Sequence, residues 1–366
     1  MTRSVSSTLD GLDVPLLLAQ YLRVSLCHLP TPLERLSALS KKLGINLWVK
    51  RDDLTGLAFG GNKSRKLELV MGDVRSQGCD TVLSWAGVQS NWCRQLAAAA
   101  RKCGMRPVLL LFRRPGLPDE LDGNYLLDTL LGSSIHLRDL DGNRDMMQLS
   151  GVADFIKQIQ KREEEEGHRV YVAPIGASRA EGSMRRPLGA LSFVLASTEL
   201  IEQAEAMGLR MNHLVTATSS GSMQAGLIAG FRLLNSNVKV TGIAVSNNDN
   251  HLPSLIAQLT QDVMDELACP GMLKHDRSEV IVHDAYAGEG YGLLDRETVN
   301  VIREVAEIEG LLLDPVYTAK AMRGLFDLAA KSYFQPGENV VFLHTGGLPA
   351  LFPYRDIIRT FTPGIS

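Results

Sequence analysis

The chain has 366 residues, of which 45% are hydrophobic and 22% are charged, and its net charge is −3. This length is enough for two packed domains. The weak negative charge excludes the basic surface typical of nucleic-acid binding proteins. We expect no membrane partner, because no stretch approaches the roughly 20 apolar residues that span a bilayer.

The cysteines and histidines of the chain show no spacing typical of disulfide frameworks or metal ligands. We therefore expect reduced thiols and no metal site, and the cysteines are Cys27, Cys79, Cys93, Cys103 and Cys269. The first 20 residues do not resemble a secretory signal peptide, because Asp10 and Asp13 precede only a short apolar run. Together these features predict a cytoplasmic protein.

Short apolar segments alternate with amphipathic ones along the chain. In the first half we expect strands at 45–51, 80–85, 106–112 and 169–174, and helices at 64–78, 91–104 and from 154 into the acidic run 163–166. Four consecutive glutamates in that run are interpreted as a solvated helix face. In the second half we expect a loop at 178–189, strands at 213–220, 238–246 and 339–345, and a helix at 223–234.

This alternation predicts the α/β class, with two domains that are each a mostly parallel twisted sheet flanked by helices. We expect a large domain formed by residues 1–65 together with 176–366, and a small domain formed by residues 66–175. Ligands of such sheets bind at the carboxyl ends of the strands. The candidate motifs fall at those ends, in the cleft between the domains.

Lys63 follows the pair Gly60–Gly61 and precedes a helix, where its side chain can reach into a cleft. A lysine that carries pyridoxal phosphate (PLP) must have its own amine in the neutral form, which burial or a nearby cation favours. Two other lysines are less suitable, because Lys50 lies within a strand and Lys66 lies on a helix that continues away. An ordinary solvated lysine at a helix start is the alternative interpretation.

A phosphate cradle is predicted where a strand ends and the helix 223–234 begins. Backbone N–H groups and hydroxyls at a helix N-terminus favour an anion, and they are offered here by Ser219, Ser220, Gly221, Ser222 and Met223. Neither GxxxxGK[ST] nor GxGxxG occurs in the chain. A serine cap without a ligand is the alternative.

Other polar residues follow further strand ends. Ser90 and Asn91 could donate hydrogen bonds to a carboxylate and to a ring oxygen, although an asparagine helix cap is the alternative. Thr345 follows the last strand, and its hydroxyl would bond a pyridine nitrogen and leave it unprotonated. Tyr291 and Tyr317 could stack on a ring, carry a proton or fill the core.

Taken together, the strings KRDD, GLAFGGNKSRKLE, QSN, GLLLDPVYTAKAM and FLHTGGLPALF resemble the D-cysteine desulfhydrase and 1-aminocyclopropane-1-carboxylate (ACC) deaminase family. The resemblance covers roughly residues 24–354. It implies PLP enzymes of the tryptophan-synthase-β-like fold type II, with PLP in the cleft, bound to the large domain. It also implies a homodimer and a small amino acid as substrate.

The resemblance assigns roles to individual positions. Lys63 would carry PLP and move the Cα proton, while Ser90 and Asn91 would hold the substrate carboxylate and the ring hydroxyl. The segment from Ser219 to Met223 would hold the phosphate. The substrate would be contacted by Tyr291, Tyr317, Trp92 and Thr318.

Two positions separate branches of this family. ACC deaminases carry Glu after the DPVY tyrosine and Leu before the final glycine pair, whereas this chain has Thr318 and Thr345, the pattern of the desulfhydrase branch. Many desulfhydrase-like members carry His after QSN, where this chain has Trp92. An arginine-containing loop at 179–186 is also longer than usual and is interpreted as solvated, with recognition of an acidic substrate as the alternative.

The expected reaction is therefore a PLP-dependent α,β-elimination on a small amino acid, giving pyruvate, ammonia and the leaving group. D-Cysteine or a β-substituted alanine is the first candidate substrate. The alternatives are β-replacement or a specialised biosynthetic step on an unusual amino acid, ACC deamination, and a non-catalytic PLP-binding protein. Fold alone does not choose among them.

Overall fold

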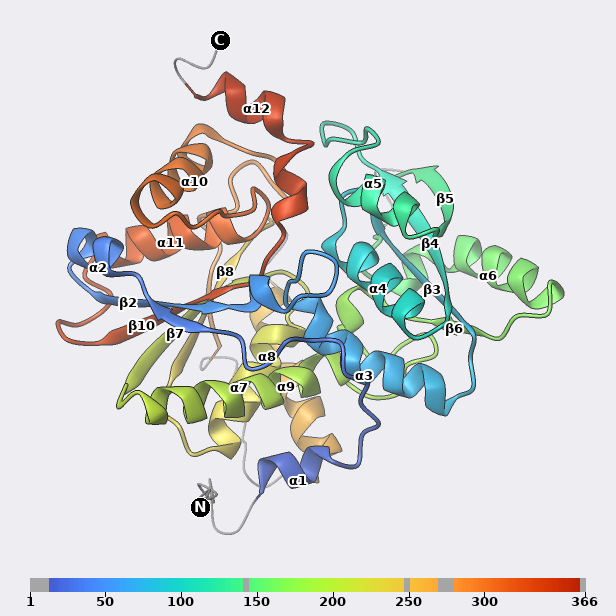
Figure 1. Ribbon diagram of the computed structural model, residues 1–366, viewed down its shortest axis with the longest axis horizontal. Coiled ribbons are helices and arrows are strands. Elements are labelled where there is room, and N and C mark those ends of the chain that lie inside the picture. The colour runs from blue at the N-terminus through green and yellow to red at the C-terminus, as the bar shows by residue number, and fades with distance from the viewer. Residues whose placement is uncertain (1–12, 141–144, 247–250, 269–279, 363–366) are drawn as a thin grey trace.

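The computed structural model describes residues 13–140, 145–246, 251–268 and 280–362. The expectation about a signal peptide concerns mostly residues 1–12, which lie outside these ranges, and so does Cys269. The described chain forms two sheets with helices around each (Figure 1).

The larger sheet has six strands in the order β1-β2-β10-β7-β8-β9. All neighbouring strands run parallel except β1, which pairs antiparallel with β2. The strands are β1 (Leu33–Arg35), β2 (Asn46–Arg51), β7 (Met211–Thr218), β8 (Lys239–Ala244), β9 (Ile281–His283) and β10 (Asn339–His344).

Helices cover both faces of the six-stranded sheet (Figure 1). Side chains of successive strand residues point to opposite faces. Along β10, Val340 and Phe342 pack with one group of helices, and Val341 and Leu343 pack with the other. The first group is α2 (Ser37–Leu43), α10 (Arg296–Glu309) and α11 (Thr318–Ala330); the second is α7 (Leu188–Ala206), α8 (Ser222–Leu233) and α9 (Leu252–Glu266).

The smaller sheet has four parallel strands in the order β5-β4-β3-β6. They are β3 (Thr81–Gly87), β4 (Arg106–Arg113), β5 (Ser134–Asp139) and β6 (Val170–Val172). Leu109 and Leu111 face a core shared with α3 and α4, while Leu110 faces α6. The surrounding helices are α3 (Lys63–Ser76), α4 (Asn91–Lys102), α5 (Gly123–Leu130) and α6 (Leu149–Glu165).

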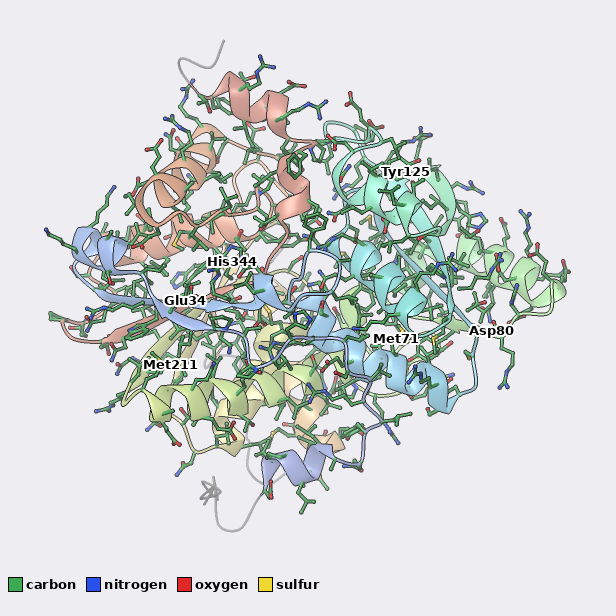
Figure 2. All side chains as sticks on the ribbon, viewed as in Figure 1. Glu34, Met71, Asp80, Tyr125, Met211 and His344 are labelled. Carbon is green, nitrogen blue, oxygen red and sulfur yellow. The ribbon has the colours of Figure 1, made fainter. Side chains whose placement is uncertain are left out.

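Two short helices, α1 (Val14–Leu18) and α12 (Arg355–Thr360), lie near the ends of the described chain. In Figure 2, Tyr125 and Asp80 mark the part of the molecule with the small sheet, and Glu34 and Met211 mark the large sheet. Within the described residues, no helix is both long and apolar enough to cross a membrane.

The predicted α/β class with two mostly parallel sheets is confirmed. All four strands of the small sheet lie within residues 66–175, but the exact domain boundaries stay a prediction. Three details were wrong. Helix α6 begins at Leu149 rather than at Asp154, α7 begins at Leu188 inside the expected loop, and Glu163 is buried against Arg106 rather than solvated.

Candidate active site

A cavity with an empty volume of about 840 Å³ opens where strands of both sheets end. Its walls include Ala86 and Gly87 at the end of β3, Ala217 and Thr218 at the end of β7, and Thr345 directly after β10. Ligands of parallel sheets bind at this edge. The candidate residues of the two sheets therefore meet in one place.

Lys63 is the first residue of α3, and it lines the cavity. The turn before it requires glycine, since Gly61 has φ of +121° and an added Cβ would lie 2.7 Å from Nε2 of Gln95. The backbone N–H of Asn62 donates to the carbonyl of Thr345 at 3.1 Å. This contact ties the start of α3 to the end of β10.

The surroundings of Lys63 favour a neutral amine. Burial lowers its pKa to about 8, and the charge of the Asp314 carboxylate opposes this shift only in part. The residues that line the cavity include no aspartate or glutamate. The amine is therefore reactive nearer to neutral pH than an exposed lysine.

Lys66 also reaches the cavity, which sequence reasoning missed. Its Nζ donates to the carbonyl of Gly176 at 2.9 Å and to Oγ of Ser222 at 2.8 Å, and burial followed by the charge of Lys63 lowers its pKa. One turn of helix brings residues three apart onto the same face. The spacing between Lys63 and Lys66 could therefore have indicated this position.

Helix α8 presents a free N-terminus to the same end of the cavity. Gly221 is its N-cap residue, with φ of +80°, and glycine has no side chain to cap the first turn. Ser219, Ser220, Gly221 and Met223 line the cavity as predicted. Ser222 does not line it, because its hydroxyl is fully buried between Lys66 and Ser178.

Helix α4 brings Ser90, Asn91 and Trp92 to the cavity. The Ser90 hydroxyl caps the helix by accepting from the N–H of Cys93 at 3.2 Å. Oδ1 of Asn91 accepts a hydrogen bond from Nδ2 of Asn124 at 2.9 Å, so its own Nδ2 remains for a ligand. Sequence reasoning gave no role to Asn124.

Trp92 forms a fixed wall of the cavity. Its indole N–H donates to Oγ of Ser84 at 2.8 Å, and that hydroxyl donates to the carbonyl of Ala173 at 2.7 Å. The side chain is buried. Because an indole has no titrating group near neutral pH, Trp92 can shape the cavity but cannot transfer a proton to the substrate.

Tyr291 and Tyr317 both line the cavity, and their hydroxyls are hydrogen-bonded to each other. Burial raises the pKa of both phenols, and the Tyr317 hydroxyl and then Arg114 oppose the shift at Tyr291. Both hydroxyls are therefore protonated near neutral pH. The pair can donate a proton to a group in the cavity.

Thr318 does not reach the cavity, so the expectation of substrate contact was wrong. Its hydroxyl donates to Oδ1 of Asp314 at 2.6 Å, and the residue is fully buried at the start of α11. The same carboxylate accepts from the N–H groups of Val316 and Tyr317, both at 3.0 Å. Thr318 and Asp314 thus hold the turn that presents Tyr317.

The loop at 179–186 also lies away from the cavity. Arg186 pairs with Glu266 at 3.4 Å, and Arg185 donates to the carbonyl of Gly182 at 3.0 Å. None of the three loop arginines, Arg179 included, lines the cavity. The alternative that they recognise an acidic substrate is therefore not supported by their positions.

Comparisons with known proteins give this cavity its chemical context. Residues 24–346 match the family model described as "Pyridoxal-phosphate dependent enzyme". The chain belongs to the pyridoxal-phosphate dependent enzyme family. Its cofactor is thus PLP. Solved structures of similar fold share the type II architecture that the sequence resemblance implies.

Relatives of this PLP enzyme carry two kinds of name. The chain is 37% identical to a "Putative 1-aminocyclopropane-1-carboxylate deaminase" of Pyrococcus abyssi, in an alignment that covers 94% of this chain and 97% of the other. It is 36% identical to a "D-cysteine desulfhydrase" of Klebsiella pneumoniae, covering 92% and 98%. A crystal structure of an ACC deaminase homologue superimposes with a TM-score of 0.83 at 34% identity, covering 95% and 99%. Both names describe lyases.

The described residues fit PLP. The partly buried Lys63 and the buried Lys66 face a cavity whose lining includes no carboxylate, so a bound anion would favour the charged forms of both amines. The N-terminus of α8 beside Lys66 favours a phosphate group. Thr345 could offer a hydroxyl and Asn91 an amide N–H to the ring, and Lys63 could offer the amine that binds the aldehyde.

Proposed function

We propose that this PLP enzyme catalyses α,β-elimination on a small β-substituted amino acid, with D-cysteine as the first candidate. The products are pyruvate, ammonia and the released β-substituent. The observation that carries the proposal is that Lys63, whose pKa is lowered to about 8, and Thr345, which has a hydroxyl, line the same cavity, and that this lining includes no carboxylate. A hydroxyl partner leaves the pyridine nitrogen unprotonated, which suits rapid expulsion of a leaving group.

PLP, when bound, supplies the electron sink that makes the Cα proton of an amino acid acidic. In our proposal Ser90 and the free N–H groups at the start of α4 hold the substrate carboxylate. The Lys63 amine removes the Cα proton. Tyr291 or Tyr317 donates a proton to the leaving atom, a role that their raised pKa values support.

Lys66 and the segment from Ser219 to Met223 would hold the cofactor phosphate. Asn91 would donate to the ring hydroxyl, and Thr345 to the ring nitrogen. Trp92 would form one wall of the substrate site and exclude water from the reacting atoms.

A second candidate is ACC deamination, because several relatives carry that name. Against it, Thr318 and Thr345 replace the Glu and Leu that the ACC deaminase resemblance would imply. A third candidate is β-replacement, which the Trp92 wall supports, since it would restrict access of water.

We also propose that the protein is a cytoplasmic homodimer. Support comes from the family resemblance and from the free thiols of Cys27, Cys79, Cys93 and Cys103. Sedimentation equilibrium of the purified protein tests the dimer. Microscopy of a fluorescent fusion in the source cell tests the compartment.

The deciding experiment supplies the PLP-loaded protein with D-cysteine, L-cysteine, L-cysteate and ACC, and assays pyruvate and 2-oxobutyrate separately. We expect pyruvate from a β-substituted alanine. 2-Oxobutyrate from ACC would favour the second candidate. A new amino acid formed in the presence of an added thiol would favour β-replacement.

A matched pair of lysine variants controls this assay. Lys63→Ala removes the proposed base and should abolish keto acid formation, whereas Lys157→Ala removes an exposed lysine of α6 and should leave it unchanged. Elimination at the wild-type rate by Lys63→Ala would refute the proposal.

A further inference from the structure

A second chamber lies beside the main cavity and shares three wall residues with it. Its empty volume is about 400 Å³, and the shared residues are Gly87, Ser90 and Tyr291. We call it the side chamber. Most of its remaining wall is apolar, formed by Val88, Phe112, Leu117, Pro118, Val316 and Tyr354.

The topology of the small sheet places this chamber next to the proposed carboxylate site. Strands β3 and β4 are parallel neighbours, and Gly87 pairs with Phe112 at their carboxyl ends. The N–H of Val88 continues the pairing by donating to the carbonyl of Phe112 at 3.1 Å. The segments that follow the two strands therefore lie side by side, one leading to Ser90 and the other to Arg114.

Arg114 is the one charged residue in the described wall of the side chamber. Its Cζ lies 5.8 Å from the centre of the Tyr291 ring, within the range of a cation–π contact. In the described part of the chain, its guanidinium has no hydrogen bond to an acceptor and no ion pair. Its neighbour Arg113 differs, because it pairs with Asp139 at 2.9 Å.

An arginine with unused donors at the edge of an apolar space is suited to an anion attached to an apolar chain. The five N–H donors of a guanidinium match a carboxylate or sulfonate in a bidentate contact. Neither the main cavity nor the side chamber is lined by a described aspartate or glutamate. The protein itself therefore offers no competing anion at this wall.

We propose that the side chamber binds the β-substituent of the substrate, and that Arg114 selects substituents ending in a carboxylate or sulfonate. Apolar atoms of the substituent would pass Tyr291 and Val88 before the anionic end meets the guanidinium. This inference rests on the proposed elimination and names its substrate class. Arg114 acts on the distal group and not on the reacting atoms.

S-(Carboxymethyl)cysteine is a simple probe of this class. In its elimination the Cα–H and Cβ–S bonds break, and the sulfur leaves with its bonding electrons and takes up a proton. One water hydrolyses the enamine that remains. The balanced reaction converts the amino acid and one water into mercaptoacetate, pyruvate and ammonia.

The experiment compares this acid with its neutral amide, S-(carbamoylmethyl)cysteine, using both D and L forms. The two probes share the thioether and nearly the same shape, so they differ mainly in charge. For each protein variant, kcat/KM is measured for both probes, and calorimetry gives the Kd of both. We expect the PLP-loaded wild type to favour the acid about tenfold in each quantity.

Arg114→Gln should bring both ratios close to unity, whereas Arg113→Gln should keep the wild-type ratios. Each ratio is formed within one variant, so an effect of Arg114 on Tyr291 cancels. Equal ratios in the wild type and in Arg114→Gln would overturn the inference. So would a wild type that treats the acid and the amide alike.

The two proposals can fail separately. If no amino acid yields a keto acid, the proposed elimination fails, and the Kd ratio still tests the side chamber. If cysteine yields pyruvate but the Kd and kcat/KM ratios do not depend on Arg114, the elimination stands and the inference is wrong.

Discussion

Nδ2 of Asn124 donates to Oδ1 of Asn91 at 2.9 Å, and this contact fixes which end of the Asn91 amide faces the cavity. Asn124 is fully buried, and its own Oδ1 accepts from Nε of Arg94 at 2.7 Å. Because a guanidinium can only donate, Asn124 must turn its Nδ2 toward Asn91. This orientation leaves Nδ2 of Asn91 available as a donor, as its proposed contact with the cofactor ring oxygen requires.

Replacing Asn124 by aspartate should weaken PLP binding about tenfold, because one oriented hydrogen bond is lost. An aspartate would pair with Arg94, so the site stays filled, but it could not donate to Asn91. The Kd is measured by absorbance titration of the cofactor-free protein. Thr129→Ala, at an exposed position of the same helix, is the control. An unchanged Kd in Asn124→Asp would show that Asn91 needs no such support.

Lys66→Met should weaken PLP binding without a large loss of stability in the cofactor-free protein. Lys66 is a buried amine whose recorded hydrogen-bond acceptors are neutral, whereas the equally buried Lys50 contacts the carboxylate of Glu199 at 2.5 Å. Removing Lys50 would leave part of that carboxylate unpaired. We therefore expect Lys50→Met to lower the Tm more than Lys66→Met does. Of the two variants, we expect only Lys66→Met to raise the Kd for PLP through a lost contact in the cavity, because Lys50 does not line it.

The main features of the fold, and the gathering of most candidate residues in one cavity, could be predicted from local patterns. Apolar strands and a glycine pair before Lys63 have recognisable spacing, and helix α8 follows its strand in the order expected for a phosphate cradle. The sequence alone predicts that the helix of Lys66 leads away from the cleft, and this prediction is wrong. Helix geometry in fact keeps residues three apart on one face.

Other features depend on packing between distant segments, which spacing does not reveal. Asn124 meets Asn91 only because α5 packs against α4. Arg114 faces Tyr291 across segments far apart in the chain. Thr318 follows the DPVY tyrosine in sequence, yet the first turn of α11 directs its hydroxyl to Asp314. The position of Thr318 next to Tyr317 in the sequence therefore suggested a wrong place for its side chain. The position of Arg114, far from Tyr291 in the sequence, gave no sign of their contact.

Glu199→Gln should reduce the free energy of unfolding by about 3 kcal/mol at pH 7, since it breaks a buried ionic network. Burial opposes the charged carboxylate, but Arg65 and Lys50 lower the pKa of Glu199 to about 2. A depressed folded-state pKa gives stability that is present above pH 4.5 and lost as the pH falls toward 2. Urea unfolding across this range should show a shallower loss in Glu199→Gln.

The exposed Glu202 on the same helix provides the control for this network. Glu202→Gln should keep both the stability at pH 7 and the acid-induced loss of the wild type. The wild type and Glu199→Gln could instead lose the same amount of stability between pH 4.5 and 2. That result would assign the acid sensitivity to other carboxylates.

The reactivity of Lys63 toward aldehydes should rise through pH 8 rather than through the ordinary lysine range. Burial lowers its pKa to about 8, while Asp314 opposes the shift. Only the neutral amine attacks an aldehyde, so the rate increases with pH and reaches half of its maximum near pH 8. Cofactor-free protein is treated with pyridoxal and borohydride at several pH values. Mass spectrometry then quantifies the modified peptide that contains Lys63.

Lys157, whose side chain is exposed, serves as the internal reference in the same digests. Parallel pH profiles for the two lysines would mean that the cavity does not lower the pKa of Lys63. Under the expected result, at pH 7 the Lys63 amine reacts faster than a surface lysine, because desolvation in a cavity whose lining includes no carboxylate destabilises its charged form.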